Sequence, residues 1–274
     1  MKKELQNNPI GVFDSGVGGL TVVKELAKIL PNENIIYFGD TARVPYGTKS
    51  KDAVIRFSNE IVGFLMDRKV KLILVACNTA SAMALNEISK KVDVKTVGVI
   101  ESGVFAAISA SKRKKIGVIG TEATIKSGAY EKNIKRFDKN IKVINHACPL
   151  FVPLAEEGWI NNQASKIIAV EYLKSIKNSG ADTVILGCTH YPLLKKVIYE
   201  VLGRKIKLID SASEVAKKVK NILEEENLIN PSNKKGRKEF FVSDAPQKFK
   251  KLGEMFLNEK IVTVTKVNIE GKYV

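Results

Sequence analysis

The stretch ILVACNTAS, residues 73–81, decides the fold that we predict for this chain. Four apolar residues run from Ile73 to Ala76 into Cys77, and small polar residues follow immediately. A short apolar run that stops at such residues predicts a buried strand whose carboxyl end opens into a loop or a helix start. In an open α/β sheet, ligands bind at that edge.

A second stretch, VILGCTHY at residues 184–191, has the same layout. Its apolar run ends at a small residue, Cys188 follows, and Thr189 and His190 come next. The two cysteines are 188 − 77 = 111 positions apart. An interval of this size invites comparison of the two halves of the chain.

The apolar stretches of the first half recur in the second half at a nearly constant interval. Ile10 corresponds to Ile116, with 116 − 10 = 106, and Ile36 to Val143, with 143 − 36 = 107. The run that starts at residue 99 corresponds to the run at 208, with 208 − 99 = 109. Self-similarity at so long a period indicates two copies of one domain rather than a solenoid.

Each copy alternates short strands with helical segments, which predicts a mostly parallel sheet flanked by helices. The expected fold is therefore α/β, with two pseudo-symmetric domains and an active site in the cleft between them. Residues past Ser211 have no counterpart in the first half, so we expect this tail to pack on the first domain. The first domain then comprises residues 1–98 and 211–274, and the second comprises residues 99–210.

The sequence also predicts individual helices and the elements of the tail. Amphipathic periodicity favours a helix where apolar residues recur every three or four positions. The expected helices span residues 20–30, 52–68, 81–91, 212–226 and 246–257, and the expected tail strands span residues 239–242 and 261–267.

Composition places the chain among soluble globular proteins. It has 274 residues, of which 45% are hydrophobic and 27% are charged, as expected for a protein with a proper core. Its cysteines, Cys77, Cys148 and Cys188, are too few and odd in number for a disulfide framework. No Cys-x-x-Cys motif occurs, and only His146 and His190 offer imidazole ligands, so we expect no metal site.

The formal net charge of +16 raises nucleic acid as a partner. The basic residues are scattered, mostly at expected helix ends or in loops, and lack interleaved aromatic residues. We interpret them as a solvated surface and expect no nucleic-acid partner. No apolar signal region follows the N-terminal MKKELQNNP, and no run approaches the ~18 apolar residues of a membrane helix. We expect a cytoplasmic protein with no membrane partner.

Two cysteines at equivalent strand ends predict an acid–base site. A pseudo-twofold axis would set Cys77 and Cys188 on opposite walls of one cleft. A cytosolic setting disfavours a disulfide, and a metal would need more soft or imidazole ligands. What remains is proton transfer on both faces of one carbon, in which one thiolate removes a proton, the other thiol delivers one, and the configuration inverts. Asp14 and His190 are placed to shift the ionisation of the thiols, whereas Cys148 lacks such a context and is interpreted as a core residue.

Three other motifs carry weaker signals. Residues 16–19 resemble a nucleotide loop, but Thr21 stands where GxGxxG needs glycine, and no GxxxxGK[ST] occurs. The polar loop 40–47 is either a plain turn or, through its Pro-Tyr-Gly end, a rigid wall for a small ligand. Glu156 is either part of a solvated helix start or a carboxylate near His190.

Eight stretches match the motifs of one known family, in the family's order. They are FDSGVGGLTV (13–22), GDTARVPYG (39–47), ACNTASA (76–82), GVIES (98–102), IGVIGTEATIKSGAY (116–130), CPLFVPLAEEG (148–158), GCTHYPLL (187–194) and IDSA (209–212). On these stretches the chain resembles glutamate racemase, a member of the aspartate/glutamate racemase superfamily. The resemblance implies interconversion of L- and D-glutamate, an isomerase activity that supplies D-glutamate for peptidoglycan and so serves cell wall biogenesis and cell shape.

The resemblance also implies roles for individual residues. Cys77 is similar to the base that acts on D-glutamate, and Cys188 to the base that acts on L-glutamate. Asp14 resembles the carboxylate that assists Cys77, while His190 with Glu156 resembles the pair that assists Cys188. The positions that match the family's substrate contacts are Asp14, Ser15, Tyr46, Gly47, Asn78, Thr79, Thr121, Thr124, Thr189 and His190.

The family's members need no pyridoxal phosphate, metal or nucleotide, so the resemblance implies a cofactor-independent enzyme. It further implies a homodimer whose only other partner is L- or D-glutamate. Two alternatives stay open from the sequence. One is a racemase of another acidic amino acid such as aspartate, and the other is a two-domain binding protein without catalysis.

Overall fold

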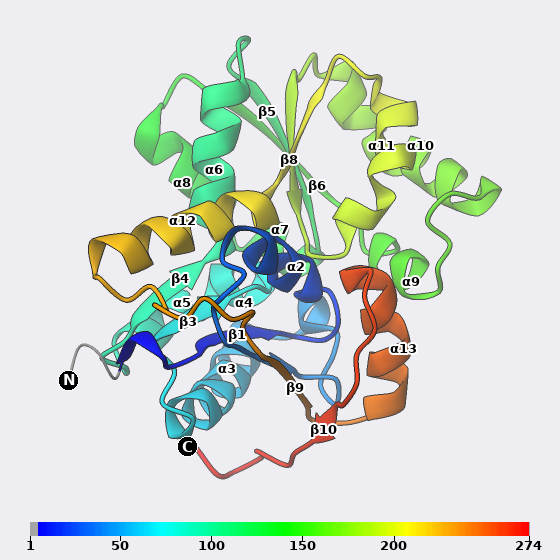
Figure 1. Ribbon diagram of the computed structural model, residues 1–274. Coiled ribbons are helices and arrows are strands. Elements are labelled where there is room, and N and C mark those ends of the chain that lie inside the picture. Colours follow the sequence, from blue (N-terminus) through cyan, green and yellow to red (C-terminus); the bar gives the residue numbers. More distant parts are fainter. Residues whose placement is uncertain (1–4, 274) are drawn as a thin grey trace.

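The computed structural model describes residues 5–273, which contain two parallel sheets flanked by helices (Figure 1). This arrangement confirms the α/β fold expected from the sequence. The larger sheet contains β1 (Ile10–Asp14), β2 (Ile35–Gly39), β3 (Leu72–Val75), β4 (Lys95–Gly98), β9 (Lys238–Val242) and β10 (Thr265–Lys266). The smaller sheet contains β5 (Lys115–Gly120), β6 (Lys142–Ala147), β7 (Thr183–Gly187) and β8 (Lys207–Asp210).

The two sheets share one strand order. Neighbouring strands of the larger sheet follow the order β2-β1-β3-β4, and those of the smaller sheet follow β6-β5-β7-β8. The first strand of each copy therefore lies between the second and the third, and all these pairs are parallel. The match shows the pseudo-symmetry that the repeat predicted, and it makes β3, before Cys77, the counterpart of β7, before Cys188.

The sequence-based alignment of the two copies is wrong at two strands. β4 ends at Gly98 and β8 at Asp210, a separation of 210 − 98 = 112 where 109 was expected. The cause is that Ile100 already lies in a helix, and apolar residues at a helix start imitate the end of a strand. At the second strand the error is one residue, since the counterpart of Ile36 is Ile144.

Helices cover both faces of each sheet (Figure 1). One face of the larger sheet packs against α2, α12 and α13, and the other packs against α3, α4 and α5. The faces of the smaller sheet are covered by α9, α10 and α11 and by α6 and α8. The helix bounds are α2 (Leu20–Ile29), α3 (Lys51–Asp67), α4 (Asn78–Met83), α5 (Leu85–Ser89), α6 (Val99–Ala110), α7 (Glu122–Lys126), α8 (Ala129–Phe137), α9 (Phe151–Glu156), α10 (Gln163–Asn178), α11 (Lys195–Leu202), α12 (Ser211–Glu225) and α13 (Pro246–Leu257), with short 3₁₀ helices η1 (Tyr46–Thr48) and η2 (Tyr191–Leu194).

Most expected helices agree with the observed ones to within one residue at each end, but two expected elements are wrong. The helix expected over residues 81–91 is two short helices, and the first begins directly after Cys77, which caps it. The tail strand expected over residues 261–267 is only two residues long, Thr265–Lys266.

Two helices each pack on the sheet of the other copy. α6 follows a strand of the larger sheet, yet its Val104 and Ala107 lie in a core of the smaller one. α12 follows a strand of the smaller sheet, yet its Val215 and Val219 lie in a core of the larger one. The tail strand β9 pairs with β2. On these contacts we propose a division into residues 1–98 with 211–274 and residues 99–210, of which residues 1–4 and 274 lie outside the described part.

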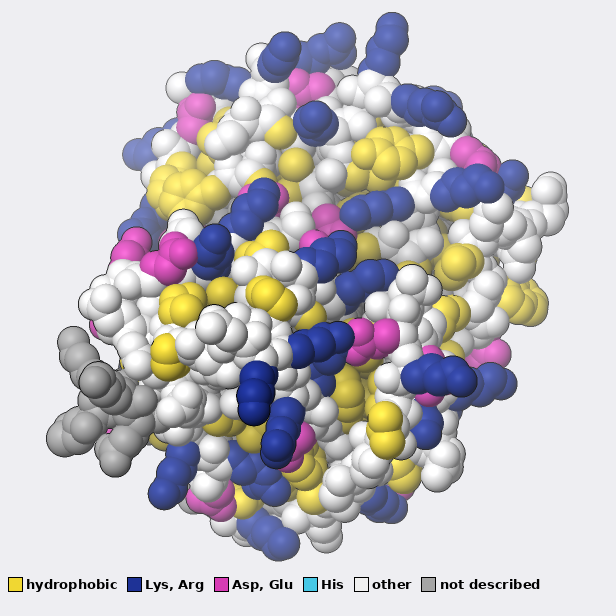
Figure 2. Space-filling model, in the orientation of Figure 1, with side chains coloured by type: hydrophobic (Ala, Val, Ile, Leu, Met, Phe, Trp, Pro, Cys, Tyr) yellow, Lys and Arg dark blue, Asp and Glu magenta, His cyan; other side chains and the backbone are white. Residues whose placement is uncertain are grey.

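The surface carries basic side chains without a dominant cluster on the face drawn in Figure 2. There, Lys and Arg are spread over the whole face and alternate with acidic and apolar side chains. Within residues 5–273, no helix combines the length and the apolar character needed to cross a membrane.

Candidate active site

The glycine-rich loop after β1 brings the larger sheet into close contact with the residues that follow β7. A Cβ atom on Gly18 would lie 2.2 Å from Oγ1 of Thr189 and 2.6 Å from Nδ1 of His190. A Cβ on Gly19 would lie 2.6 Å from the Cβ of Asp14. Real Cβ atoms do not approach so closely, so these glycines allow tight packing at the cleft. This close packing explains why the loop is rich in glycine, and a nucleotide-binding role is not needed to explain it.

The two cysteines expected to face each other line one small cavity. Cys77 follows β3, and its sulfur accepts a hydrogen bond from the N–H of Ala80 at 3.5 Å and lies 3.8 Å from Oγ of Ser15. Cys188 follows β7 directly and lines the same cavity. The volume of this cavity is about 20 Å³, which is room for about one water molecule. The cleft between the two copies is therefore closed in this structure.

Most of the expected substrate contacts lie around this cavity, and three expected site residues do not line it. Asp14, Glu156 and Thr124 stand behind the wall and contact residues that do line it. The lining residues are Ser15, Val44, Pro45, Tyr46, Gly47, Cys77, Asn78, Thr79, Thr121, Val152, Cys188, Thr189 and His190.

Beside Cys188, the buried His190 pairs with the half-buried Glu156. Nε2 of His190 lies 3.1 Å from Oε1 of Glu156, and Nδ1 lies 3.8 Å from the sulfur of Cys188. Burial alone would lower the pKa of His190, but the hydrogen bonds with Cys188 and Glu156 outweigh it and raise the pKa to about 10. Burial would likewise raise the pKa of Glu156, yet the hydrogen bond from His190 lowers it. The imidazole is thus protonated at neutral pH and places a positive charge beside the sulfur of Cys188.

A different environment surrounds Cys77. Burial raises the pKa of its thiol to about 12, and the nearby carboxylate of Asp14 adds to the rise. Burial also raises the pKa of Asp14, although the charge of His190 and hydrogen bonds from backbone N–H groups, such as that of Gly16 at 3.1 Å, oppose the change. Thr189 donates to Asp14 across the cleft at 3.5 Å. The two cysteines therefore differ, since Cys77 is a neutral thiol and Cys188 faces a cation.

Three threonines join the two copies at one side of the cavity. Oγ1 of Thr79 lies 3.0 Å from that of Thr121 and 3.1 Å from that of Thr124. A Cβ on Gly47 would lie 2.7 Å from the Cβ of Thr121. The loop after β2 therefore contacts the smaller sheet's domain at this point, as a wall of the cavity.

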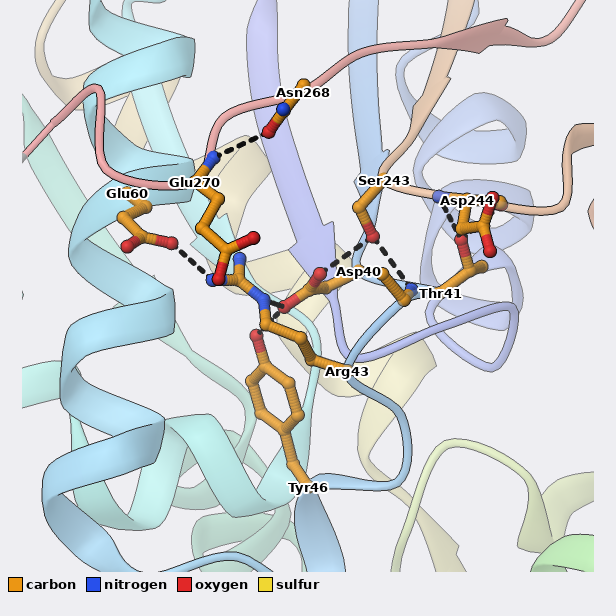
Figure 3. Close-up of polar contacts among 10 residues, drawn as sticks. Asp40, Thr41, Arg43, Tyr46, Glu60, Ser243, Asp244, Asn268 and Glu270 are labelled. Carbon is orange, nitrogen blue, oxygen red and sulfur yellow. Dashed lines mark hydrogen bonds and ion pairs between the residues drawn. The ribbon is translucent and has the colours of Figure 1, made fainter.

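The wall formed by Tyr46 is anchored by a buried network of charged groups (Figure 3). The hydroxyl of Tyr46 donates to the carboxylate of Asp40, which also accepts from Nε of Arg43 at 2.7 Å and from Ser243 at 2.8 Å. A second carboxylate, that of Glu60, pairs with the other side of the Arg43 guanidinium. This network therefore holds Tyr46, which lines the cavity, in place through its hydroxyl.

Sequence reasoning missed several contributors to the site. Val152 lines the cavity, and the ring of Phe256 packs edge-on against His190 with the centroids 5.5 Å apart. Both are apolar residues in helices, and nothing in their sequence context separates them from core residues. The glycine run at residues 16–19 is a signal for the close packing at Gly18, but such a run is equally typical of a nucleotide loop. Within residues 5–273, no group of three or more His, Cys, Asp and Glu side chains is arranged to hold a metal ion.

Comparison with known proteins agrees with this arrangement. A family model described as Asp/Glu/Hydantoin racemase matches residues 10–219. A glutamate racemase of Geobacter metallireducens is 52% identical over 263 residues, which cover 96% of this chain and 97% of that relative. The crystal structure of a Francisella tularensis glutamate racemase in complex with D-glutamate is 42% identical and has a TM-score of 0.92, covering 97% of this chain and 99% of that one. A glutamate racemase isoform from Bacillus anthracis is 38% identical, with a TM-score of 0.93 and coverage of 96% and 98%. The chain belongs to the Asp/Glu/hydantoin racemase family.

Proposed function

We propose that this chain interconverts L- and D-glutamate without a cofactor, using Cys77 and Cys188 as the two bases. One observation carries the proposal: two sulfurs, each at the carboxyl end of the third strand of its copy, reach the same cavity. The substrate follows from the relatives, which are named glutamate racemases, one of them solved with D-glutamate.

The reaction moves one proton off a carbon and another onto it. A thiolate removes the α-proton, and the electron pair of the broken C–H bond stays on the substrate as a carbanion. The opposite thiol then donates its proton to the other face of the α-carbon, so the configuration inverts and the thiol and the thiolate have exchanged roles. The two groups act as general base and general acid.

The unequal surroundings of the sulfurs support a direction for each. Cys77 is protonated at neutral pH, because burial raises its pKa to about 12, while Cys188 faces the charged imidazole of His190. We therefore assign Cys188, beside the His190 cation, as the base for L-glutamate, and Cys77 as the thiol that delivers the proton. D-glutamate requires the reverse state, in which Cys77 acts as the base after its thiol proton has passed to Asp14, whose pKa burial raises.

Substrate binding needs the walls of the cavity to separate, because its volume of about 20 Å³ does not hold an amino acid. Hydroxyl, amide and backbone groups on both walls are suited to hold the two carboxylates and the ammonium group of glutamate. The proposed contacts are Asp14, Ser15, Tyr46, Gly47, Asn78, Thr79, Thr121, Thr124, Thr189 and His190.

The cellular setting is part of the same proposal. A glutamate racemase supplies D-glutamate for peptidoglycan, and we propose that role for this chain, in the cytoplasm and as a homodimer. Light scattering of the purified protein tests the assembly, and a mass near that of a single 30.2 kDa chain at micromolar concentration contradicts the dimer.

A deuterium wash-in experiment tests the reaction. Each enantiomer is incubated in D₂O in a chelator-containing buffer without added cofactor, and the label is followed early in the reaction by NMR and chiral chromatography. Two bases predict that solvent deuterium enters chiefly the product enantiomer. Cys77→Ser and Cys188→Ser should each lower turnover roughly 10²- to 10⁴-fold.

Cys148→Ala is the matched control, because Cys148 is buried in a core of the smaller sheet and does not line the cavity. It should keep the activity of the unmodified protein. Glutamate that stays optically unchanged over hours contradicts the proposal. Faster turnover of aspartate than of glutamate would point to the other acidic amino acid.

A further inference from the structure

We propose that Tyr130 is a positioning residue for the substrate, because its hydroxyl orients the side-chain amide of Asn78 so that the NH₂ group faces a substrate carboxylate. The inference rests on the proposed racemase function, since Asn78 matters here as a substrate contact. It adds a residue that lies outside the cavity lining and acts through another side chain.

Tyr130 reaches the site from the core of the smaller sheet's domain. It lies in the first turn of α8 and is 2% exposed. Its ring packs over Gly187, where an added Cβ would lie 3.0 Å from Cε2 of the tyrosine. Gly187 is the last residue of β7 and immediately precedes Cys188. The ring therefore passes the end of this strand on its way to the other copy.

The hydroxyl of Tyr130 contacts a residue on the opposite wall of the cavity. It donates to Oδ1 of Asn78 at 2.6 Å, and Oγ of Ser211 lies 3.5 Å from the same hydroxyl. Asn78 directly follows Cys77, begins α4 and lines the cavity. Within residues 5–273, Nδ2 of Asn78 donates a hydrogen bond to no protein atom. This nitrogen is also not completely buried, so it reaches the cavity that Asn78 lines.

The orientation of this amide decides what it can bind. A primary amide donates through its nitrogen and accepts through its oxygen. With the oxygen held by Tyr130, the NH₂ group faces the cavity, where it can donate to a carboxylate. A half-turn of the amide would present the oxygen instead and repel the same carboxylate. Because Tyr130 and Asn78 come from different copies, the hydroxyl holds the amide only when the cleft is closed as it is here.

Tyr130→Phe tests the inference, because it removes the hydroxyl and keeps the ring that fills the core. KM for both enantiomers of glutamate should rise about five- to tenfold, the effect of one lost hydrogen bond, with kcat changed less than about twofold. Tyr172→Phe is the control, since its hydroxyl contacts the backbone N–H of Leu150 in the same domain, away from the cavity. It should leave KM unchanged.

A double-mutant cycle shows whether Tyr130 acts through Asn78. If it does, Tyr130→Phe should raise KM in the parent but cause no further rise in an Asn78→Ala background. A merely structural role would give the same factor in both backgrounds, and that result overturns the inference, as does an unchanged KM in the single variant. An active parent with either result leaves the proposed function standing. A parent that does not racemise glutamate overturns the function and the inference together.

Discussion

A Cβ atom on Gly18 would lie 2.6 Å from Nδ1 of His190, the ring nitrogen that faces the sulfur of Cys188. The loop after β1 thus contacts the residue beside Cys188, while the same loop begins next to Asp14, whose charge acts on Cys77. One short segment thus contacts both His190 and Asp14, the groups that we propose assist the two cysteines. The two halves of the site are therefore positioned together.

Gly18→Ala should lower kcat strongly with a smaller effect on folding. The added methyl group must push away Thr189 and His190, and displacing a catalytic group by about 1 Å costs on the order of 100-fold in rate. Gly16→Ala is the matched control in the same loop, because its Cβ meets only Val44, at 3.3 Å. Steady-state racemisation by circular dichroism measures both. Equal activities of the two variants would show that this contact does not position His190.

Much of the fold could be predicted from the sequence because the two copies repeat the same pattern of strands and helices. Short apolar runs that end in small polar residues predicted both sheets. The prediction is wrong at the fourth strand, because the apolar residues Val99 and Ile100 begin α6 and do not lie in a strand. A run of a few apolar residues fits both a strand and a helix. Only the pairing of β3 with β4, which stops at Gly98, shows where the strand ends.

Less of the site could be predicted, for a physical reason. Cys77 and Cys188 carry rare chemistry in matched contexts, so local sequence was enough to bring them together. Tyr130 and Phe256 look like ordinary core aromatics, and their relation to Asn78 and His190 depends on contacts between segments far apart in the chain. Such relations exist only after the two copies have packed.

Arg43→Met should destabilise the protein and weaken substrate binding. The substitution leaves two buried carboxylates, Asp40 and Glu60, without their shared cation, which costs roughly 3–5 kcal/mol. Because Asp40 also holds Tyr46, KM should rise as this wall loosens. Arg56→Met is the control, since Arg56 is exposed and touches the same Phe57 ring from farther away. Thermal unfolding and KM measure the effects, and equal losses of stability in the two variants would rule out the network.

Glu156→Gln should slow the proton transfer at Cys188 more than that at Cys77. Enantiomers have equal free energies in water, so kcat/KM must fall equally in both directions, by roughly 10- to 100-fold for one charged hydrogen bond. The asymmetry should appear in the isotope effect, which should be larger for α-deuterated L-glutamate than for the D form. Asp14→Asn should reverse that order. The exposed neighbour Glu157, changed to Gln, serves as the control, and equal isotope effects for both enantiomers in Glu156→Gln would contradict the assignment of Cys188.

The ring of His190 should stay protonated through neutral pH and lose its proton only near pH 10, because its hydrogen bonds raise its pKa to about 10 from an ordinary value of 6.5. The folded state then holds this proton more tightly than the unfolded chain does. Its contribution to stability is fully present below about pH 6.5 and is lost as pH rises through about 10. The gap in melting temperature between the parent and His190→Gln should therefore shrink over that range. Since the chain has two histidines, His146→Gln leaves a single ring to follow by NMR, and a ring that titrates near pH 6.5 would show that Glu156 and Cys188 do not hold it charged.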